Sequence, residues 1–147
     1  MRRTVWIVAA VLFVLVVGFL LARYLTTENR ERGQVHRLLQ AEAAGDADKM
    51  LSLLDPSCKA DAKCAATVRA NAAKLKRAGD PKIIAYDSKT AYALGAKTGL
   101  TRVAWTVVDN GLPVVQCVSV HRGGSAIAGR TVTLLRISAP IGNEATC

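Results

Sequence analysis

The stretch from Val5 to Ala22 constrains this chain more than any other, because its 18 residues include no charged or strongly polar side chain. As an α-helix it would be roughly 27 Å long, close to the hydrocarbon thickness of a bilayer. Trp6 and Tyr24 lie at its two ends, where aromatic rings favour the membrane boundary, and arginines flank it on both sides. The sequence therefore predicts an N-terminal transmembrane helix.

A cleaved secretory signal peptide is the alternative to a retained anchor, because such peptides also begin with basic residues and an apolar run. The run here is longer than the usual ~7–15 residues, and Leu20-Leu21-Ala22 before Arg23 lacks the small-x-small cleavage pattern. We therefore predict a cytoplasmic tip and transmembrane signal-anchor over residues 1–22. A juxtamembrane stem over residues 23–33 and an extracytoplasmic α+β domain over residues 34–147 would follow it.

All four cysteines follow this apolar stretch: Cys58, Cys64, Cys117 and Cys147. An even number of cysteines in a small domain behind a membrane or secretory segment is typical of disulfides formed in an oxidising compartment. A zinc site is the alternative, but these cysteines lack its short paired spacing. Since arginines flank the helix on both sides, charge does not orient it. The disulfides instead favour a cytoplasmic N-terminus and an extracytoplasmic domain in the cell membrane.

Four cysteines allow three disulfide pairings, and we favour Cys58 with Cys64 and Cys117 with Cys147. Cys58 lies just before a predicted helix over Lys59–Ala78, and Cys64 lies about one and a half turns inside it. A bond between them would hold the preceding loop against the helix. Cys147 ends an irregular tail, which a bond to Cys117 on a strand would keep from fraying.

The hydrophobic spacing changes after Pro81 from that of helices to that of strands. Before this point Asp46 is a candidate N-cap for a second short helix. The predicted strands and turns that follow are Lys82–Asp87, Lys89–Leu94, Leu100–Asp109, an Asn110-Gly111 hairpin, Val114–His121, a turn at Arg122–Ser125, and Thr131–Ser138. The sequence thus predicts an α+β fold, with the N-terminal transmembrane helix followed by two to three helices packed on a curved antiparallel β-sheet of about four to five strands.

This order of elements resembles the nuclear-transport-factor-like, or cystatin-like cone, superfamily, and more narrowly its small membrane-anchored members outside the cytoplasm of Gram-positive bacteria. The resemblance covers about residues 34–138 and rests on Ala44-Gly45-Asp46, the following Met50–Leu54, and the strands TRVAWTVVD, PVVQCVSVH and TVTLLRIS. It implies isomerases, dehydratases, secretion-system subunits or plain binding modules as relatives. Fold alone does not choose among these functions.

Enzymes of that superfamily use Asp, His or Tyr side chains in the pocket of the cone. Tyr86, Tyr92 and Trp105 are the candidates for lining such a pocket here, although isolated aromatic residues on strands more often belong to the core. The remaining acid–base candidates have simpler explanations as a helix surface, a sheet rim, a strand end and a turn: His36, His121, Asp87 and Asp109. We find no catalytic constellation, no phosphate loop and no metal or cofactor motif.

The chain carries 20 basic and 11 acidic residues, a balance that favours anionic neighbours. The predicted helix over Lys59–Ala78 concentrates part of this charge as a candidate anionic-surface contact: Lys63, Arg69, Lys74, Lys76 and Arg77. A solvated helix face is the simpler interpretation. Phospholipid headgroups, reached through the membrane contact of Val5 to Ala22, or an anionic envelope polymer are the candidate ligands. Scarce aromatic residues argue against specific binding of nucleic acid.

The sequence-based hypothesis is a single-pass membrane-anchored extracytoplasmic binding or scaffold domain, non-enzymatic, stabilised by two disulfides and directed at a protein partner or an envelope component. A subunit of a secretion, conjugation or lipid-uptake envelope complex is one alternative. A small-molecule isomerase or hydrolase of the cone fold is the other. The sequence leaves the oligomeric state open.

Overall fold

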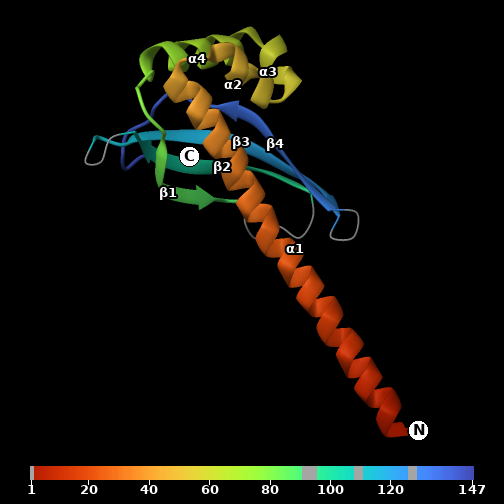
Figure 1. The fold of residues 1–147 in the computed structure, drawn as a ribbon. Helices are drawn as coiled ribbons and strands as arrows, with labels where there is room; N and C mark the ends of the chain where they lie inside the picture. Colours follow the sequence, from red (N-terminus) through yellow and green to blue (C-terminus); the bar gives the residue numbers. More distant parts are fainter. Residues whose placement is uncertain (1, 91–95, 108–110, 126–128) are drawn as a thin grey trace.

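A computed structural model of the chain describes residues 2–90, 96–107, 111–125 and 129–147. Over these residues four helices precede four strands: α1 (Arg2–Ala44), α2 (Ala47–Leu53), α3 (Pro56–Ala60), α4 (Ala62–Lys74), β1 (Lys82–Ser88), β2 (Lys97–Thr106), β3 (Val114–Ser125) and β4 (Gly129–Ile137). The predicted α+β class, with helices packed on an antiparallel sheet, is thus present. Figure 1 shows α1 lying across one face of the sheet, with α2, α3 and α4 gathered around its C-terminal end.

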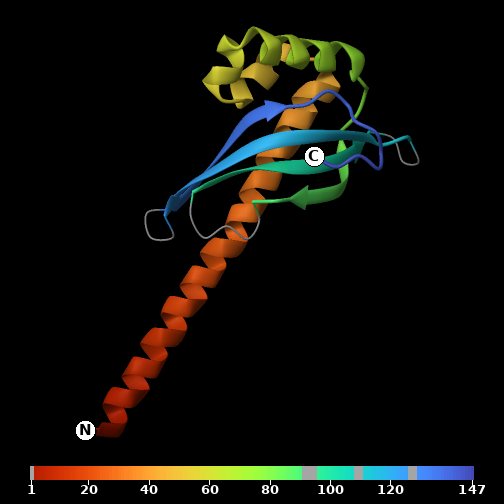
Figure 2. The ribbon, with the colours of Figure 1, turned by 180° about the vertical axis from the view of Figure 1, so that it is seen from behind.

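Helix α1 is one unbroken element of 43 residues, and its N-terminal part projects away from the sheet in both ribbon views (Figure 2). Its apolar side chains from Trp6 to Leu21 are exposed, Trp6 by 73%. Within the described part of the chain, however, no helix is long and apolar enough to cross a membrane. This finding contradicts the predicted transmembrane helix and leaves the signal-anchor interpretation unsupported. The prediction had separated a membrane helix, a stem and a domain. In the structure the apolar stretch does not form a helix of its own, because the same helix continues through residues 23–33 into the domain core.

The sheet has the order β1-β2-β3-β4, with every neighbouring pair antiparallel. Thr101, Val103 and Trp105 alternate along β2 toward the buried side that α1 covers, as the period-2 pattern predicted. Register shifts between Ile83 and Ala85 and between Ser119 and Val120 interrupt the two outer pairings. Such bulges bend strands and increase their twist, which suits a sheet that wraps around a helix.

Three local predictions differ from the structure. The segment Arg122–Ser125 continues β3 and pairs with Gly129–Val132 of β4, so the predicted turn there is wrong. The helix predicted over Lys59–Ala78 is split at Asp61, which ends α3 and caps α4 by accepting hydrogen bonds from two backbone N–H groups. Of the strand predicted over Lys89–Leu94, the described residues Lys89 and Thr90 form a turn, and residues 91–94 lie outside the described part. Asp109 and Asn110 of the predicted hairpin also lie outside it.

The core forms between the inner face of the sheet and the helices. Val35, Leu38 and Leu39 of α1 are fully buried, and they meet fully buried side chains of the sheet such as Val103 and Val118. The predicted N-cap Asp46 is confirmed, since its carboxylate accepts a hydrogen bond from the Lys49 backbone N–H at 2.9 Å. At the preceding chain reversal Gly45 has a φ of +76°, which a residue with a Cβ rarely adopts.

Candidate functional site

The inner face of α1 carries a glutamate at each end of its buried apolar stripe. Glu31, Val35, Leu38 and Glu42 follow one another at intervals of four, three and four residues, so they lie on one side of the helix. All four are fully buried. Buried carboxylates are costly unless they are neutral or hydrogen-bonded, so each must be accounted for by its surroundings.

Glu31 is the centre of a closed cluster of polar side chains from three strands. Its Oε1 accepts hydrogen bonds from the hydroxyls of Tyr86 at 2.6 Å, Thr101 at 2.7 Å and Ser88 at 2.9 Å. Its Oε2 accepts from the Nε of Arg122 at 2.6 Å, pairs with the same guanidinium at 2.5 Å, and accepts from Thr90 at 3.2 Å. The Glu31 cluster therefore fastens α1 to β1, β2 and β3 at once.

The environment keeps Glu31 ionised. Burial alone would raise its pKa, but hydrogen bonds from Tyr86, Thr101 and Arg122, together with the charge of Arg122, lower that pKa below its ordinary value. Burial and the hydrogen bond to Glu31 raise the pKa of Tyr86, so its hydroxyl stays protonated and remains a donor. The cluster thus holds one carboxylate and one guanidinium whose charges compensate each other.

Glu42 forms a second cluster, three turns along the same helix face. Its Oε1 accepts a hydrogen bond from the Nε2 of Gln116 at 2.7 Å, and the Oε1 of Gln116 accepts from the indole N–H of Trp105 at 2.8 Å. Asn71 of α4 lies beside them and donates to the Ser138 carbonyl at 2.8 Å. The Glu42 cluster therefore joins α1, α4, β2 and β3.

Glu42 differs from Glu31 in having no cation beside it. Burial raises its pKa to about 7, because the opposing hydrogen bonds from Gln116 and Asn71 are weaker than the cost of burying the charge. Its Oε2 is buried and has no hydrogen-bond partner in the described structure. The neutral acid avoids most of this cost, so the fold favours a protonated Glu42 at pH values below about 7.

The described cavities lie outside the core, along the two flanks of α1. One of about 770 Å³ is lined by Asn29, Arg30, Gly33, Gln34, Arg37, Thr131 and Val132. A neighbouring one of about 250 Å³ shares Gln34, Arg37 and Val132 and extends to residues 52–56. A third, of about 430 Å³, lies on the β1 flank between Arg32, His36 and Ile83. Neither Glu31 nor Glu42 lines any of these three.

The aromatic residues predicted to line a pocket are separated in the structure. The half-buried Tyr86 belongs to the Glu31 cluster, with the Arg32 guanidinium 5.9 Å from its ring centre. Trp105 is fully buried in the Glu42 cluster. Tyr92 lies outside the described residues. The first two serve the attachment of α1 to the sheet.

The predicted basic surface lies on α4 and just after it. Lys63, Arg69 and Lys74 are exposed on α4, and Lys76 and Arg77 are exposed beyond its end. The Arg77 backbone N–H donates to the Ala43 carbonyl at 2.8 Å, which ties this segment to the end of α1. His36 is half-buried with Nε2 3.0 Å from the Pro81 carbonyl oxygen, and His121 is half-buried with Nδ1 2.9 Å from the Thr98 hydroxyl.

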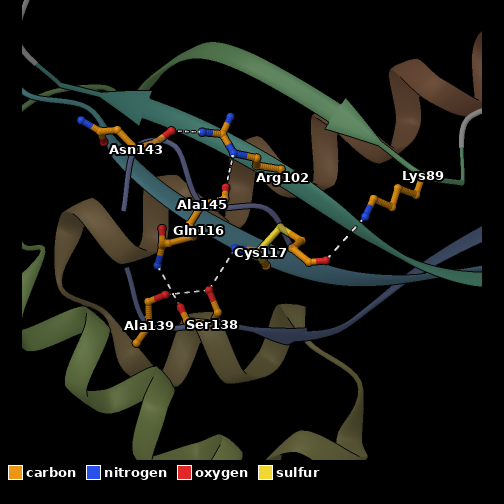
Figure 3. The surroundings of a disulfide bond; sticks show 9 residues. Lys89, Arg102, Gln116, Cys117, Ser138, Ala139, Asn143 and Ala145 are labelled. Atoms are coloured by element: carbon orange, nitrogen blue, oxygen red, sulfur yellow. Dashed lines mark hydrogen bonds between the residues drawn. A yellow bond between two sulfur atoms is a disulfide. The ribbon is translucent and has the colours of Figure 1, made fainter. Parts of the chain in front are cut away.

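Both predicted disulfides are confirmed: Cys58 bonds to Cys64 and Cys117 bonds to Cys147, with Cα–Cα distances of 5.2 and 5.7 Å. The second bond holds the C-terminal tail against β2 and β3 (Figure 3). There the Arg102 guanidinium donates to the carbonyls of Asn143 and Ala145, and the Ser138 hydroxyl accepts from the Cys117 N–H at 2.9 Å. Two disulfides are consistent with an oxidising compartment.

Glu31 and Glu42 were missed by the sequence analysis, although a usable pattern exists. Both occupy positions where the apolar stripe of α1 predicts a buried residue, and an acidic residue at such a position must be compensated. Their partners were not predictable in the same way, because Arg122 lies 91 residues beyond Glu31 and Gln116 lies 74 beyond Glu42.

Comparisons with protein-family models, with curated proteins and with solved structures found no match.

Proposed function

We propose that this chain is an extracytoplasmic binding or scaffold domain without catalytic activity of its own, stabilised by its two disulfides. The observation that carries the proposal is the network of hydrogen-bonded side chains between α1 and the sheet, among the residues that the structure describes. An enzyme of the cone fold would direct its acidic and aromatic side chains into a pocket. Here such side chains take part in hydrogen bonds with their neighbours between α1 and the sheet. The described cavities instead open on the surface beside α1, where a partner could bind without reaching the buried glutamates.

The order of elements supports the resemblance to cystatin-like cone domains as part of this proposal. Helices come first, and a bent antiparallel sheet of four strands covers α1. In such a domain a long helix and a sheet of fixed register offer a rigid platform for a partner. Rigid elements and two covalent crosslinks suit a scaffold outside the cytoplasm.

The quenching of Trp105 fluorescence tests whether the interior is closed. In a Trp6→Phe variant Trp105 is the only tryptophan, and we expect acrylamide to quench it far less than it quenches the exposed Trp6 in a Trp105→Phe variant. Equal quenching of the two would mean that solvent reaches the Glu42 cluster, and the non-enzymatic proposal would then fail.

Thiol labelling in intact cells tests the compartment. We expect no cysteine of the full chain to react with a maleimide reagent before reduction, and all four to react after reduction in denaturant. Free thiols in freshly denatured, acid-quenched cells would place the domain in a reducing compartment and contradict the proposal.

An isomerase or hydrolase is favoured by one observation, the raised pKa of Glu42. A carboxyl group with a pKa of about 7 is suited to general acid–base catalysis near neutral pH. Such a group must also reach a substrate, and Glu42 is fully buried and lines none of the described cavities. The quenching experiment decides this alternative too, because substrate access to Glu42 requires an opening beside Trp105.

A subunit of a secretion, conjugation or lipid-uptake complex is favoured by the N-terminal part of α1. Its apolar side chains from Trp6 to Leu21 are exposed over successive turns, and large exposed apolar surfaces mark interaction sites. This alternative predicts oligomers of the full chain in mild detergent by sedimentation velocity. A monomer at high protein concentration would count against it.

A further inference from the structure

Strand β4 has an outer edge that is only partly covered. Among the strands that the structure describes, β3 alone pairs with β4, which therefore ends the sheet on this side. Toward its C-terminal end the edge is covered by the chain between α2 and α3, where Leu54 bridges Leu134 and the Asp55 N–H donates to the Leu134 carbonyl at 2.7 Å. From Thr131 to Thr133 no described strand meets this edge. Uncovered edges are templates for pairing with another chain.

The two cavities on this flank of α1 form one groove along the uncovered edge. They share Gln34 and Arg37 of α1 and Val132 of β4, so each continues the other. Three successive residues of β4, Val132 to Leu134, line the smaller cavity. Since successive side chains of a strand point to opposite faces, a cavity that touches all three lies beside the strand edge. We call this the α1–β4 groove, defined by Asn29, Arg30, Gly33, Gln34, Arg37 and Thr131–Leu134, with residues 52–56 at its end.

The wall that α1 contributes to the groove is basic. Arg30 and Arg37 are exposed, lie two helical turns apart on one face, and have no ion-pair partner among the described residues. Their Cα atoms are therefore about 10 Å apart. Acidic side chains two or four residues apart on one side of an extended chain are separated by roughly 7 or 13 Å, which flexible arginines can bridge. The acidic residue of the groove, Asp55, already accepts a hydrogen bond from the Ser57 N–H as the cap of α3.

We propose that the α1–β4 groove binds an extended acidic peptide segment of a partner protein. The peptide adds a strand to the uncovered edge of β4, and its carboxylates pair with Arg30 and Arg37. Addition of a strand supplies main-chain hydrogen bonds, and the arginines supply selectivity for acidic side chains. This inference rests on the proposed role as a binding domain and names the class of its ligand.

Gly33 provides a way to close the groove without disturbing the fold. It lies between Arg30 and Arg37 in the helix sequence and borders both the larger cavity and the one on the β1 flank, and a Cβ placed on it meets no atom within 4 Å. A Gly33→Phe variant should therefore fold, keep both arginines and add a bulky ring at the border of the groove. Phe is also more favourable than Gly at a helix interior, so the replacement does not weaken α1.

The test uses the full chain in mild non-ionic detergent and a fluorescein-labelled peptide of ten residues, in which glutamate alternates with valine or threonine. We expect saturable binding by fluorescence anisotropy, with shifts of the Thr131 to Thr133 amide signals by NMR. Affinity should fall at least tenfold in Gly33→Phe and in the double variant Arg30→Glu/Arg37→Glu. The matched control Arg69→Glu/Lys74→Glu makes the same change in net charge on α4 and should change affinity less than twofold.

Two further probes separate strand addition from attraction of charge alone. A peptide of equal charge in which every backbone nitrogen is methylated offers no N–H donor to the edge of β4, so it should bind at least tenfold more weakly. Inorganic polyphosphate tests an anionic polymer as the ligand. The proposal is overturned if polyphosphate or the N-methylated peptide binds as tightly as the first peptide, if both double variants lose affinity equally, or if no peptide binds at 1 mM. The Trp105 and thiol experiments are independent of these outcomes, so either proposal can fail alone.

Discussion

The buried Glu42 predicts an unusual dependence of stability on pH. Its pKa is about 7 in the folded chain and lies near 4.5 for an ordinary glutamate. Between these values the folded chain holds a proton that the unfolded chain has released, so the free energy of unfolding falls as pH rises. At about 1.4 kcal/mol per pH unit within this window, the chain should lose roughly 2–3 kcal/mol between pH 5 and pH 8.

A Glu42→Gln variant should remove this loss. Its amide keeps the acceptor for Gln116 and resembles the neutral acid in shape, yet it cannot ionise. The variant and the natural chain should have nearly equal stability at pH 5, and the variant should be more stable by about 2–3 kcal/mol at pH 8. Urea denaturation followed by far-UV circular dichroism, at four pH values in mild detergent and with disulfides intact, measures the difference.

The comparison cancels the contributions of all groups that titrate alike in the variant and in the natural chain. Glu31→Gln is a control in which the pH dependence of stability has the opposite sign. The pKa of Glu31 is lowered on folding, so its charge stabilises the fold above its ordinary pKa. Leaving Arg122 without its buried carboxylate partner should cost about 3–5 kcal/mol at pH 7. Equal pH slopes in Glu42→Gln and the natural chain, or a destabilised Glu42→Gln at pH 8, would refute the reasoning.

Two further predictions concern the crosslinks and the tail. Replacing both cysteines of the Cys117–Cys147 bond by serine should cost about 3.6 kcal/mol and those of the Cys58–Cys64 bond about 2.2 kcal/mol, because the loops they close span 30 and 6 residues. Urea midpoints of the two double variants measure this order, and the reverse order would contradict the loop-entropy argument. Arg102→Ala removes two hydrogen bonds to tail carbonyls and should cost about 1–2 kcal/mol. Faster amide exchange confined to residues 142–147 is the expected sign, and unchanged exchange there would show that the disulfide alone holds the tail.

Local patterns were sufficient wherever the deciding contacts are close in sequence. Period-2 alternation located the strands around Val103 and Val118, and Asp46 was recognised as a cap because its partner is three residues away. The pairing of Cys58 with Cys64 followed from their places beside and inside a helical segment. Local patterns also failed at Arg122–Ser125, where two glycines suggested a turn, because pairing with β4 outweighs their weak strand preference.

The sequence by itself predicted the α+β class and the favoured disulfide pairing. The tertiary structure alone decided that α1 runs unbroken into the domain. The predicted transmembrane helix was wrong, because no described helix is long and apolar enough to cross a membrane. It also decided the protonation states of the two buried glutamates. Glu31 beside Arg122 has its pKa lowered by hydrogen bonds, whereas Glu42 beside Gln116 has its pKa raised to about 7 by burial. The physical reason is that a buried charge depends on its nearest neighbours in space, and the sheet brings those neighbours from more than 70 residues away.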